Sequence, residues 1–311
     1  MTTLNKNKIC LTLDIGGTHI RFGLFNQKGK LIAVEKRVVG ALKSPNEIVH
    51  LIKNWVNEKN LILTSVIAGV PGIVNGSRGI VYASPHYPEW KNVPIGKLMR
   101  QALGVHVLID NDANMIALGE MNFGAGSKFK SFIMLTLGTG IGGGLIFNRA
   151  LFTGETGFAG EIGHIVVNPL GHFCACGSRG CLETYVSHSA LKRYILNQSL
   201  QKKHQDFKAA LEADWGRVSL KLAKKGHKHC SFIYREMAMY LAIGIANIAN
   251  TTGVFNFVIG GGLSSALPLM KPHLMDELKR RIYNYSYQQI RIVKAMLGDK
   301  AGLLGCFSKT L

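Results

Sequence analysis

Three glycine-rich segments, each directly after a short apolar run, constrain the fold of this chain more than any other feature. They are residues 14–18 (Asp-Ile-Gly-Gly-Thr), 138–144 (Gly-Thr-Gly-Ile-Gly-Gly-Gly) and 260–262 (Gly-Gly-Gly). Glycine lets a backbone approach a phosphate closely, and the N–H groups of such turns bind anions. One such turn is common in hairpins, but three turns after three strands indicate a site for a phosphorylated ligand.

The residues around these turns exclude two standard phosphate-binding motifs. No Gly-Lys-Ser/Thr is present, so none of them is a Walker A loop. Residues 140–144 approach the dinucleotide fingerprint, but they lead into a strand-like run and not into a helix. A nucleoside triphosphate held by paired hairpins fits the pattern better.

An internal repeat indicates that the fold is duplicated. Leu-Thr-Leu at residues 11–13, a glycine turn and Gly-Leu-Phe-Asn at 23–26 return as Leu-Thr-Leu at 135–137, a glycine turn and Gly-Leu-Ile-Phe-Asn at 144–148. We expect two related halves that face one another across a cleft. The alternative is that one short match arose by chance.

The remaining pattern alternates strands and helices, which is typical of an α/β protein. Strands are expected at residues 9–13, 20–25, 31–39, 66–70, 105–109 and 255–259, and helices at 113–121 and 232–252. Another helix should begin after Ser44, because Ser44, Pro45 and Glu47 form a capping box with proline in the first turn. Its expected buried face is Ile48, Leu51, Ile52, Trp55 and Val56.

Composition narrows the class of protein. The 311 residues are 47% hydrophobic and only 18% charged, which suffices for a core and excludes a disordered chain. Only residues 9–13 are apolar before Asp14, so we expect no signal peptide, and glycines interrupt the best candidate for a membrane span, the uncharged residues 131–147. We therefore expect a soluble, cytoplasmic protein.

The chain is strongly basic, with a net charge of +19. Such charge raises nucleic acid as a partner. The excess is densest at residues 192–228, where ten basic residues meet three acidic ones in helix-like sequence. This pattern favours a solvated basic face over specific nucleic-acid binding, and its field would also attract an anionic small molecule.

Three cysteines within eight residues, Cys174, Cys176 and Cys181, predict a metal site. In a chain without a signal peptide, this spacing favours thiolate ligation of zinc over disulfides. Zinc needs a fourth ligand, for which His164 is the first candidate and His172 the competitor. Four protein ligands would close the site and make it structural. The alternative is a group of reduced, buried cysteines.

Several acidic residues are candidates for chemistry. Residues 110–112 (Asp-Asn-Asp) come after an apolar strand, where a carboxylate is placed to face a ligand cleft. The alternative is that Asp112 only caps the next helix. Glu161 and Glu183 flank the predicted zinc site together with His164; they could bind vicinal hydroxyls or support the zinc ligands.

Five motifs together resemble the ROK family of sugar kinases and repressors. They are residues 14–18, 111–114 (Asn-Asp-Ala-Asn), 137–144, 160–164 (Gly-Glu-Ile-Gly-His) and 174–183, and the resemblance runs from Asp14 to Gly305. It implies an actin-like, duplicated two-domain α/β fold of the hexokinase and Hsp70 superfamily, with a cleft between the domains. The implied domains are residues 1–113 with 299–311, and residues 114–298 with the zinc-binding loop.

The resemblance also implies roles for individual residues. Asp112 would be the catalytic base that accepts the proton of a sugar 6-hydroxyl, and Asp14 would orient Mg²⁺ through water. The sugar would contact Asn111, Glu161, His164 and Glu183. ATP phosphates would bind Gly16, Gly17, Thr18, Thr139 and Gly140, with Gly261 and Gly262 on the nucleotide side. Structural Zn²⁺ would bind His164, Cys174, Cys176 and Cys181.

The implied activity is ATP-dependent phosphorylation of an aldohexose, with glucose first and N-acetylglucosamine, N-acetylmannosamine or allose as alternatives. Two departures bear on the site: His86 stands where an asparagine near the sugar is frequent, and His188 where glycine is frequent. Residues 18–22 and 174–177 are similar to allose kinases, and residues 145–148 to N-acetylglucosamine kinases. Sequence therefore does not choose the sugar.

Other classes are weaker expectations. Family repressors carry a DNA-binding domain ahead of the first glycine turn, and here Asp14 is the fourteenth residue, which leaves no room for one. A zinc-stabilised scaffold without catalysis is disfavoured because Asp14 and Asp112 are both present. The resemblance further implies a homodimer that acts in carbohydrate metabolism and glycolysis.

Overall fold

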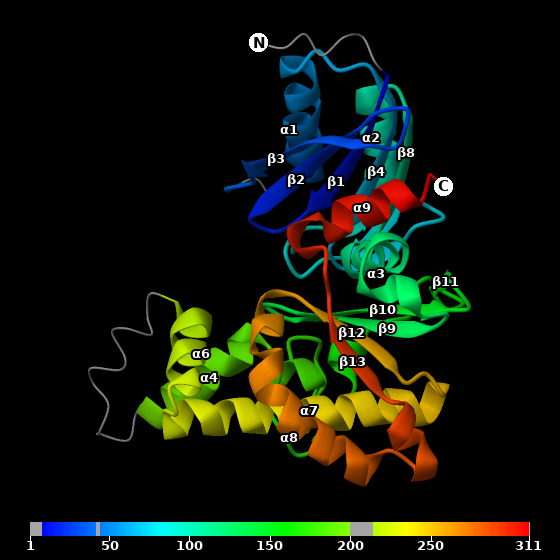
Figure 1. Cartoon of the computed structure of the whole chain (residues 1–311). Coiled ribbons are helices and arrows are strands. Elements are labelled where there is room, and N and C mark those ends of the chain that lie inside the picture. The colour runs from blue at the N-terminus through cyan, green and yellow to red at the C-terminus, as the bar shows by residue number, and fades with distance from the viewer. Residues whose placement is uncertain (1–7, 42–43, 200–213, 311) are drawn as a thin grey trace. The chain divides into compact units, whose positions relative to one another are not determined.

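The computed structural model describes residues 8–41, 44–199 and 214–310 (Figure 1). Its strands are β1 (Ile9–Ile15), β2 (His19–Phe25), β3 (Leu31–Val38), β4 (Leu63–Val70), β5 (Ile73–Asn75), β6 (Ile80–Ala83), β7 (Lys91–Val93), β8 (His106–Asn111), β9 (Phe132–Leu137), β10 (Ile141–Phe147), β11 (Ala150–Phe152), β12 (Asn256–Gly260) and β13 (Arg291–Lys294). Its α-helices are α1 (Pro45–Glu58), α2 (Ile95–Leu103), α3 (Asp112–Phe123), α4 (His188–Ser199), α6 (Trp215–Lys224), α7 (Lys228–Thr252), α8 (Leu267–Arg281) and α9 (Ala301–Ser308). Every strand and helix expected from the sequence is present.

Two five-stranded sheets share one topology. The first has the order β3-β2-β1-β4-β8 and the second β11-β10-β9-β12-β13. In each, the first strand of the half is central, the next two lie to one side, and the last two lie to the other. The predicted duplication is therefore confirmed. A small sheet, β5-β6-β7, is inserted between β4 and β8.

The described chain divides into two compact units. The first is drawn from Met1–Lys130, Gly144–Gly160 and Leu297–Leu311, and the second from Ser131–Gly143 and Glu161–Met296. The first unit extends beyond residue 113, the expected domain boundary, and includes α3, which packs against α9.

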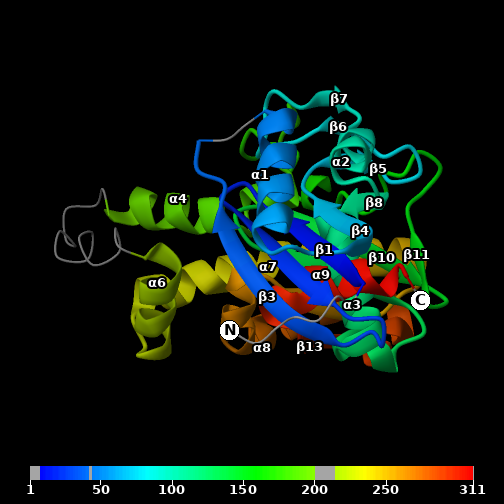
Figure 2. The same cartoon turned by 90° about the horizontal axis from the view of Figure 1, so that it is seen from above.

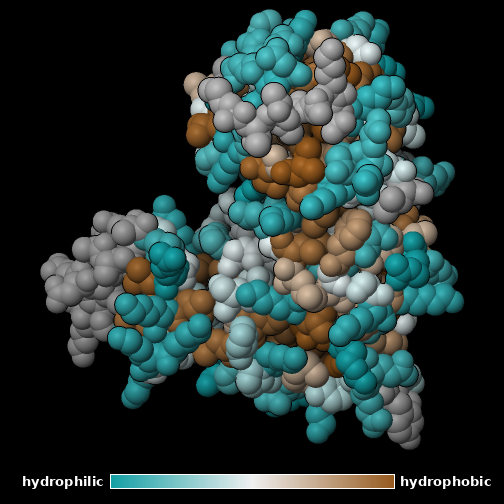
Figure 3. All heavy atoms as spheres, turned by 45° about the horizontal axis from the view of Figure 1, so that its top comes forward, coloured by the Kyte–Doolittle hydropathy of each residue, from teal (hydrophilic) through white to brown (hydrophobic). Residues whose placement is uncertain are grey.

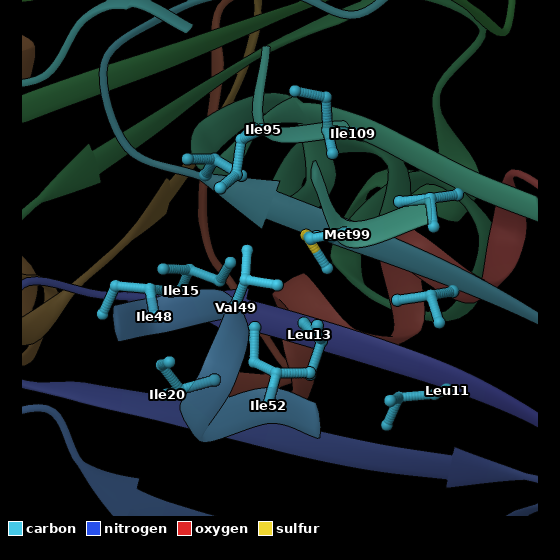
Figure 4. Close-up of a cluster of buried hydrophobic side chains, with 14 of the residues drawn as sticks. Leu11, Leu13, Ile15, Ile20, Ile48, Val49, Ile52, Ile95, Met99 and Ile109 are labelled. Carbon is cyan, nitrogen blue, oxygen red and sulfur yellow. The ribbon is translucent and has the colours of Figure 1, made fainter. Parts of the chain in front are cut away.

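In the first unit the sheet lies between helices (Figures 1 and 2). On one face, alternate residues of β1 pack against α1 and α2, and their side chains point toward one another in Figure 4. Among them Leu11, Leu13, Ile15, Ile48 and Ile52 are fully buried. The opposite face meets α9, where a Cβ on Gly23 would lie 3.2 Å from Leu303.

Local sequence signals explain where the helices begin and end. Ser44 Oγ accepts the Glu47 N–H (3.2 Å), and the Glu47 carboxylate accepts the Ser44 N–H (2.9 Å), which is the predicted capping box. The buried face of α1 differs from the expectation at one position, since Val49 is buried and Leu51 is only partly buried. Helix α7 ends at Gly253, which has φ 69° as a left-handed C-cap requires.

Within the described residues, no helix is both long and apolar enough to cross a membrane. Figure 3 shows hydrophilic residues over much of the face that it draws in colour, with apolar residues between them. Part of the predicted basic segment, residues 200–213, lies outside the described residues. Of its described part, Lys192, Arg217, Lys221 and Lys224 are exposed, as a solvated basic face requires.

Candidate active site

The first glycine turn joins β1 to β2. The loop before β7 packs against this turn and forms a hydrogen bond with it. The Gly16 N–H donates to the carbonyl of His19 (2.9 Å), and the Tyr87 hydroxyl donates to the Gly16 carbonyl (2.9 Å). A Cβ on Gly17 would lie 2.8 Å from the His86 ring. Glycine is therefore the residue that fits at position 17, and His86 lies against this turn.

Asp14 opens the turn and is paired with a residue that sequence reasoning did not single out. Its Oδ2 accepts a hydrogen bond from Arg21 Nη1 (2.9 Å), and Arg21 Nη2 lies 3.3 Å from Asp299. Burial raises the pKa of Asp14, and the Arg21 guanidinium opposes that rise. The register of the β1–β2 hairpin would have identified this pair, because Asp14 and Arg21 lie directly opposite each other on the two strands.

The segment Asp110–Asp112 lies at the same edge of the first sheet as Asp14. β1, β4 and β8 are parallel, with Asp14 beside Gly69 and Gly69 beside Asp110. Two strand spacings, about 10 Å, therefore separate Asp14 from Asp110. Ligands of open α/β sheets bind at this carboxyl edge.

The capping residue of α3 is Asn111 and not Asp112. Asn111 Oδ1 accepts the N–H groups of Ala113 (2.9 Å) and Asn114 (3.2 Å), and its Nδ2 donates to the Gly72 carbonyl (2.9 Å). The half-buried Asp112 is the first residue of the helix, and its Oδ1 also accepts the Ala113 N–H (2.9 Å). The capping alternative for Asp112 is therefore wrong.

In the second unit, the second glycine turn is bound to Glu183. The Gly138 N–H donates to the Gly140 carbonyl (2.9 Å), and the Ile141 N–H donates to Glu183 Oε2 (2.8 Å). A Cβ on Gly140 would lie 2.2 Å from that same oxygen. A larger residue at position 140 would therefore displace the Glu183 carboxylate from the turn.

The third glycine turn adjoins the second. β12 runs parallel to β9, with Gly260 beside Thr136. Gly261 has φ 79°, and a Cβ on it would lie 2.3 Å from the Leu137 carbonyl. Strand β9 leads into the second turn, so the two turns form one glycine-lined edge.

The predicted metal ligands come together in the loop between β11 and α4. The ligand atoms of His164, Cys174, Cys176 and Cys181 all lie within 4.8 Å of one another. Cys176 Sγ is 3.7 Å from Cys181 Sγ, and Cys174 Sγ is 3.6 Å from His164 Nδ1. Tetrahedral zinc with bonds of about 2.3 Å to sulfur places sulfurs about 3.8 Å apart, so the donor set fits zinc.

His172, the competing ligand, is not part of this group. It is exposed, and its backbone N–H donates to the Tyr185 hydroxyl (3.2 Å). Of the three cysteines, Cys174 and Cys181 are buried and Cys176 is exposed. Burial raises the pKa of the Cys181 thiol to about 12, so a cation is needed to hold it as a thiolate at neutral pH.

The two ring nitrogens of His164 face different partners, one the metal ligand Cys174 and the other Glu161. Nδ1 faces Cys174, and Nε2 lies 3.9 Å from Glu161 Oε2. Burial and the nearby Glu183 carboxylate raise the pKa of Glu161, while His164 lowers it. The Glu161 side chain is still 50% exposed and so is open to a ligand. Glu183 stands two residues after Cys181, so the same loop positions both carboxylates.

The structure therefore gathers the predicted residues in two places. The carboxyl edge of the first sheet carries Asp14, Gly16, Gly17, Thr18, Asn111 and Asp112. The second unit carries Thr139, Gly140, Glu161, His164, Glu183, Gly261 and Gly262.

Comparison with known proteins agrees with this geometry. The chain matches the ROK family over residues 10–310 and belongs to it. It is 33% identical over 306 residues to a glucokinase of Streptomyces coelicolor, covering 96% of each chain. It is 30% identical to the xylose repressor of Caldicellulosiruptor bescii, covering 96% of this chain and 77% of the repressor.

A solved structure shows the same fold. The ROK family glucokinase from Streptomyces griseus, in complex with glucose and AMPPNP, superposes with a TM-score of 0.81 at 31% identity, over 97% of this chain and 98% of that one. The fold is thus the actin-like fold of the ROK family, as the sequence predicted. The relatives include both glucokinases and xylose repressors, so the site and not the family distinguishes the functions.

Proposed function

We propose that this chain is an ATP- and Mg²⁺-dependent sugar kinase that phosphorylates the 6-hydroxyl of an aldohexose, with glucose as the first candidate. One observation carries the proposal: Glu183 Oε2 accepts the Ile141 N–H of the second glycine turn at 2.8 Å. A carboxylate suited to sugar hydroxyls and a turn suited to phosphates are thereby one hydrogen-bonded unit. The glucokinase relatives support the same reaction.

In the proposed reaction each group has one task. Asp112 accepts the proton of the 6-hydroxyl as that oxygen attacks the terminal phosphorus of ATP, and ADP leaves. Glu161, Glu183 and the Nε2 of His164 hold ring hydroxyls, while Asn111 supports the start of α3 beside the base. Phosphoryl transfer depends mainly on such positioning and on neutralisation of charge.

The two cations have different tasks. Mg²⁺ would neutralise phosphate charge when bound, and Asp14 offers the hard oxygen atom that would orient this ion through water. Zn²⁺ fits the donor set of His164, Cys174, Cys176 and Cys181, and would hold the loop that carries Glu161 and Glu183.

A panel of hexoses in a coupled ADP-release assay tests the proposal. It should include glucose, allose, mannose, N-acetylglucosamine and N-acetylmannosamine. Turnover of glucose above the others is the expected result; turnover of another hexose would change only the substrate, and absence of turnover with every hexose would overturn the kinase proposal. A gel shift with DNA at moderate salt tests the repressor class in parallel.

His86 is the residue to vary for sugar choice. It lies against Gly17, and the resemblance to ROK kinases implies that relatives often carry asparagine there. His86→Asn should change the ratio of kcat/KM values among the hexoses more than it changes KM for ATP. An unchanged ratio would remove His86 from the sugar site.

A further inference from the structure

His188 is the first residue of α4 and is attached to the second glycine turn. Its backbone N–H donates to the Gly138 carbonyl (2.9 Å). The next residue supports the same contact, since Ser189 Oγ donates to the Thr139 carbonyl (3.3 Å). The helix start is capped independently by Ser187, whose Oγ accepts the Ala190 N–H (3.0 Å). The backbone position of His188 is therefore defined by contacts that its side chain does not make.

The imidazole of His188 lies between two glycines. A Cβ on Gly262, in the third glycine turn, would lie 3.2 Å from Nε2. A Cβ on Gly216, near the start of α6, would lie 3.5 Å from Cε1. The ring thus occupies the open side of Gly262, where a larger residue would crowd it.

The ring is nevertheless available to a ligand. His188 is exposed, and within the described part of the chain its imidazole makes no hydrogen bond to protein. Burial of part of the ring lowers its pKa, while the Asp214 carboxylate, which caps α6, acts in the opposite direction. A neutral imidazole offers one donor and one acceptor, which suits a hydroxyl group.

The location points to one kind of ligand atom. The second and third turns adjoin, because β9 and β12 are parallel neighbours and Gly261 packs on Leu137. In the proposed function the second turn holds phosphates and the third lies on the nucleoside side. The ribose of a nucleotide lies between its phosphates and its base. A nucleotide bound along this edge would therefore place its ribose beside the His188 ring.

We propose that the His188 imidazole forms a hydrogen bond with a ribose hydroxyl of the nucleotide. This inference rests on the proposed function only in requiring a bound nucleotide, not a particular sugar. It assigns this chain a nucleotide contact that a glycine at residue 188 could not make.

Calorimetric titration of the full chain with Mg²⁺ and ADP, without hexose, tests the contact. His188→Ala should weaken ADP binding about 3- to 10-fold, the worth of one hydrogen bond. His188→Gln should restore most of the affinity, because its amide can replace one ring nitrogen. His229→Ala, which removes an exposed histidine of α7, is the matched control and should leave the affinity unchanged.

Ribose analogues locate the contact on the nucleotide. Wild-type protein should bind 2′-deoxy-ADP or 3′-deoxy-ADP more weakly than ADP, and His188→Ala should abolish that difference. Tripolyphosphate should bind both proteins equally. Unchanged ADP affinity in His188→Ala, an equal loss with tripolyphosphate, or persistence of the deoxy difference would each overturn the inference.

These outcomes are separable from failure of the proposed function. If wild-type protein binds ADP but phosphorylates no hexose, the kinase proposal fails and the His188 contact is still judged by the titrations. If it phosphorylates a hexose while His188→Ala binds ADP normally, the contact alone is wrong. Absence of any ADP binding by wild-type protein overturns both.

Discussion

Lys309 Nζ lies 2.6 Å from Asp110 Oδ2, so the C-terminal segment supplies the counter-charge for a carboxylate that stands two residues before the proposed base. The Asp110 side chain is only 7% exposed, and its Oδ1 accepts hydrogen bonds from the Asn111 N–H (2.8 Å) and from Asn114 Nδ2 (3.0 Å). The pair thus joins the C-cap of α9 to the end of β8.

Removal of Lys309 should destabilise the fold. Lys309→Ala leaves a buried carboxylate without its cation, and because Lys309 is partly exposed we expect a loss of about 1–3 kcal/mol in the free energy of unfolding. Urea titration measures it. The double variant Asp110→Asn/Lys309→Ala should lose less than the sum of the two single variants; strict additivity would show that the pair does not interact.

The zinc proposal predicts a coupled loss of metal, stability and activity. Cys176→Ser removes one of four ligands, and a structural metal contributes its binding energy to folding. We expect one zinc per chain in the wild-type protein by elemental analysis, less in the variant, and a lower Tm and activity together. Cys230→Ser, a buried cysteine outside the group, is the control for zinc content. Purified wild-type protein that is active without zinc would contradict the assignment.

The base assignment predicts loss of rate without loss of fold. Since Asn111 caps α3, Asp112→Asn should change stability by well under ~1 kcal/mol. Loss of a general base should lower kcat by about 10²- to 10⁴-fold, with KM for the sugar nearly unchanged. Asn111→Ala supplies the contrast, with a stability loss of about 1 kcal/mol. An Asp112→Asn protein that retains most of its turnover would place the chemistry elsewhere.

Glu35 on β3 predicts a pH-dependent contribution to stability. A hydrogen bond from Lys59 Nζ (2.5 Å) is the main cause that lowers the pKa of this carboxyl, and Trp55 Nε1 donates another (3.2 Å). A carboxyl with a lowered folded-state pKa stabilises the fold above its unfolded pKa, about 4.3, and that stabilisation disappears as pH falls through the folded value.

Denaturant titrations of Glu35→Gln and wild-type protein should therefore differ at pH 7 and converge below about pH 4. Lys59→Met, which removes the main cause, should reduce the same pH dependence. A gap between wild-type and Glu35→Gln proteins that stays constant from about pH 7 to about pH 3 would contradict this prediction.

Local patterns in the sequence were sufficient to predict most of the strands and helices. Apolar runs, the Ser44 capping box and the terminal Gly253 act over a few residues, so they predict strands and helix ends. The repeat at residues 11–26 and 135–148 predicted a duplicated fold, because similar segments in the same order form similar strands. The three cysteines at residues 174–181 predicted a metal site because they are close together in the sequence.

Contacts between distant segments could not be predicted in this way. Cysteine spacing did not choose between His164 and His172, since that choice depends on how the loop folds back. Likewise nothing near Asp14 in sequence identifies Arg21 without the hairpin register, and nothing near residue 110 identifies Lys309. The capping alternative named Asp112, one residue after the actual cap, because both Asn111 and Asp112 have capping side chains.

Helix α9 has a consequence for how the protein is made. Its buried residues, among them Leu303 and Cys306, cover a face of a sheet whose strands are translated long before them. The second unit, residues 131–143 and 161–296, therefore leaves the ribosome before the first can be completed, although domains commonly fold from the N-terminus onward during synthesis. Until α9 has emerged from the ribosome, the apolar face that it covers on the first sheet stays exposed, so we expect a chain truncated before α9 to leave the first unit unfolded.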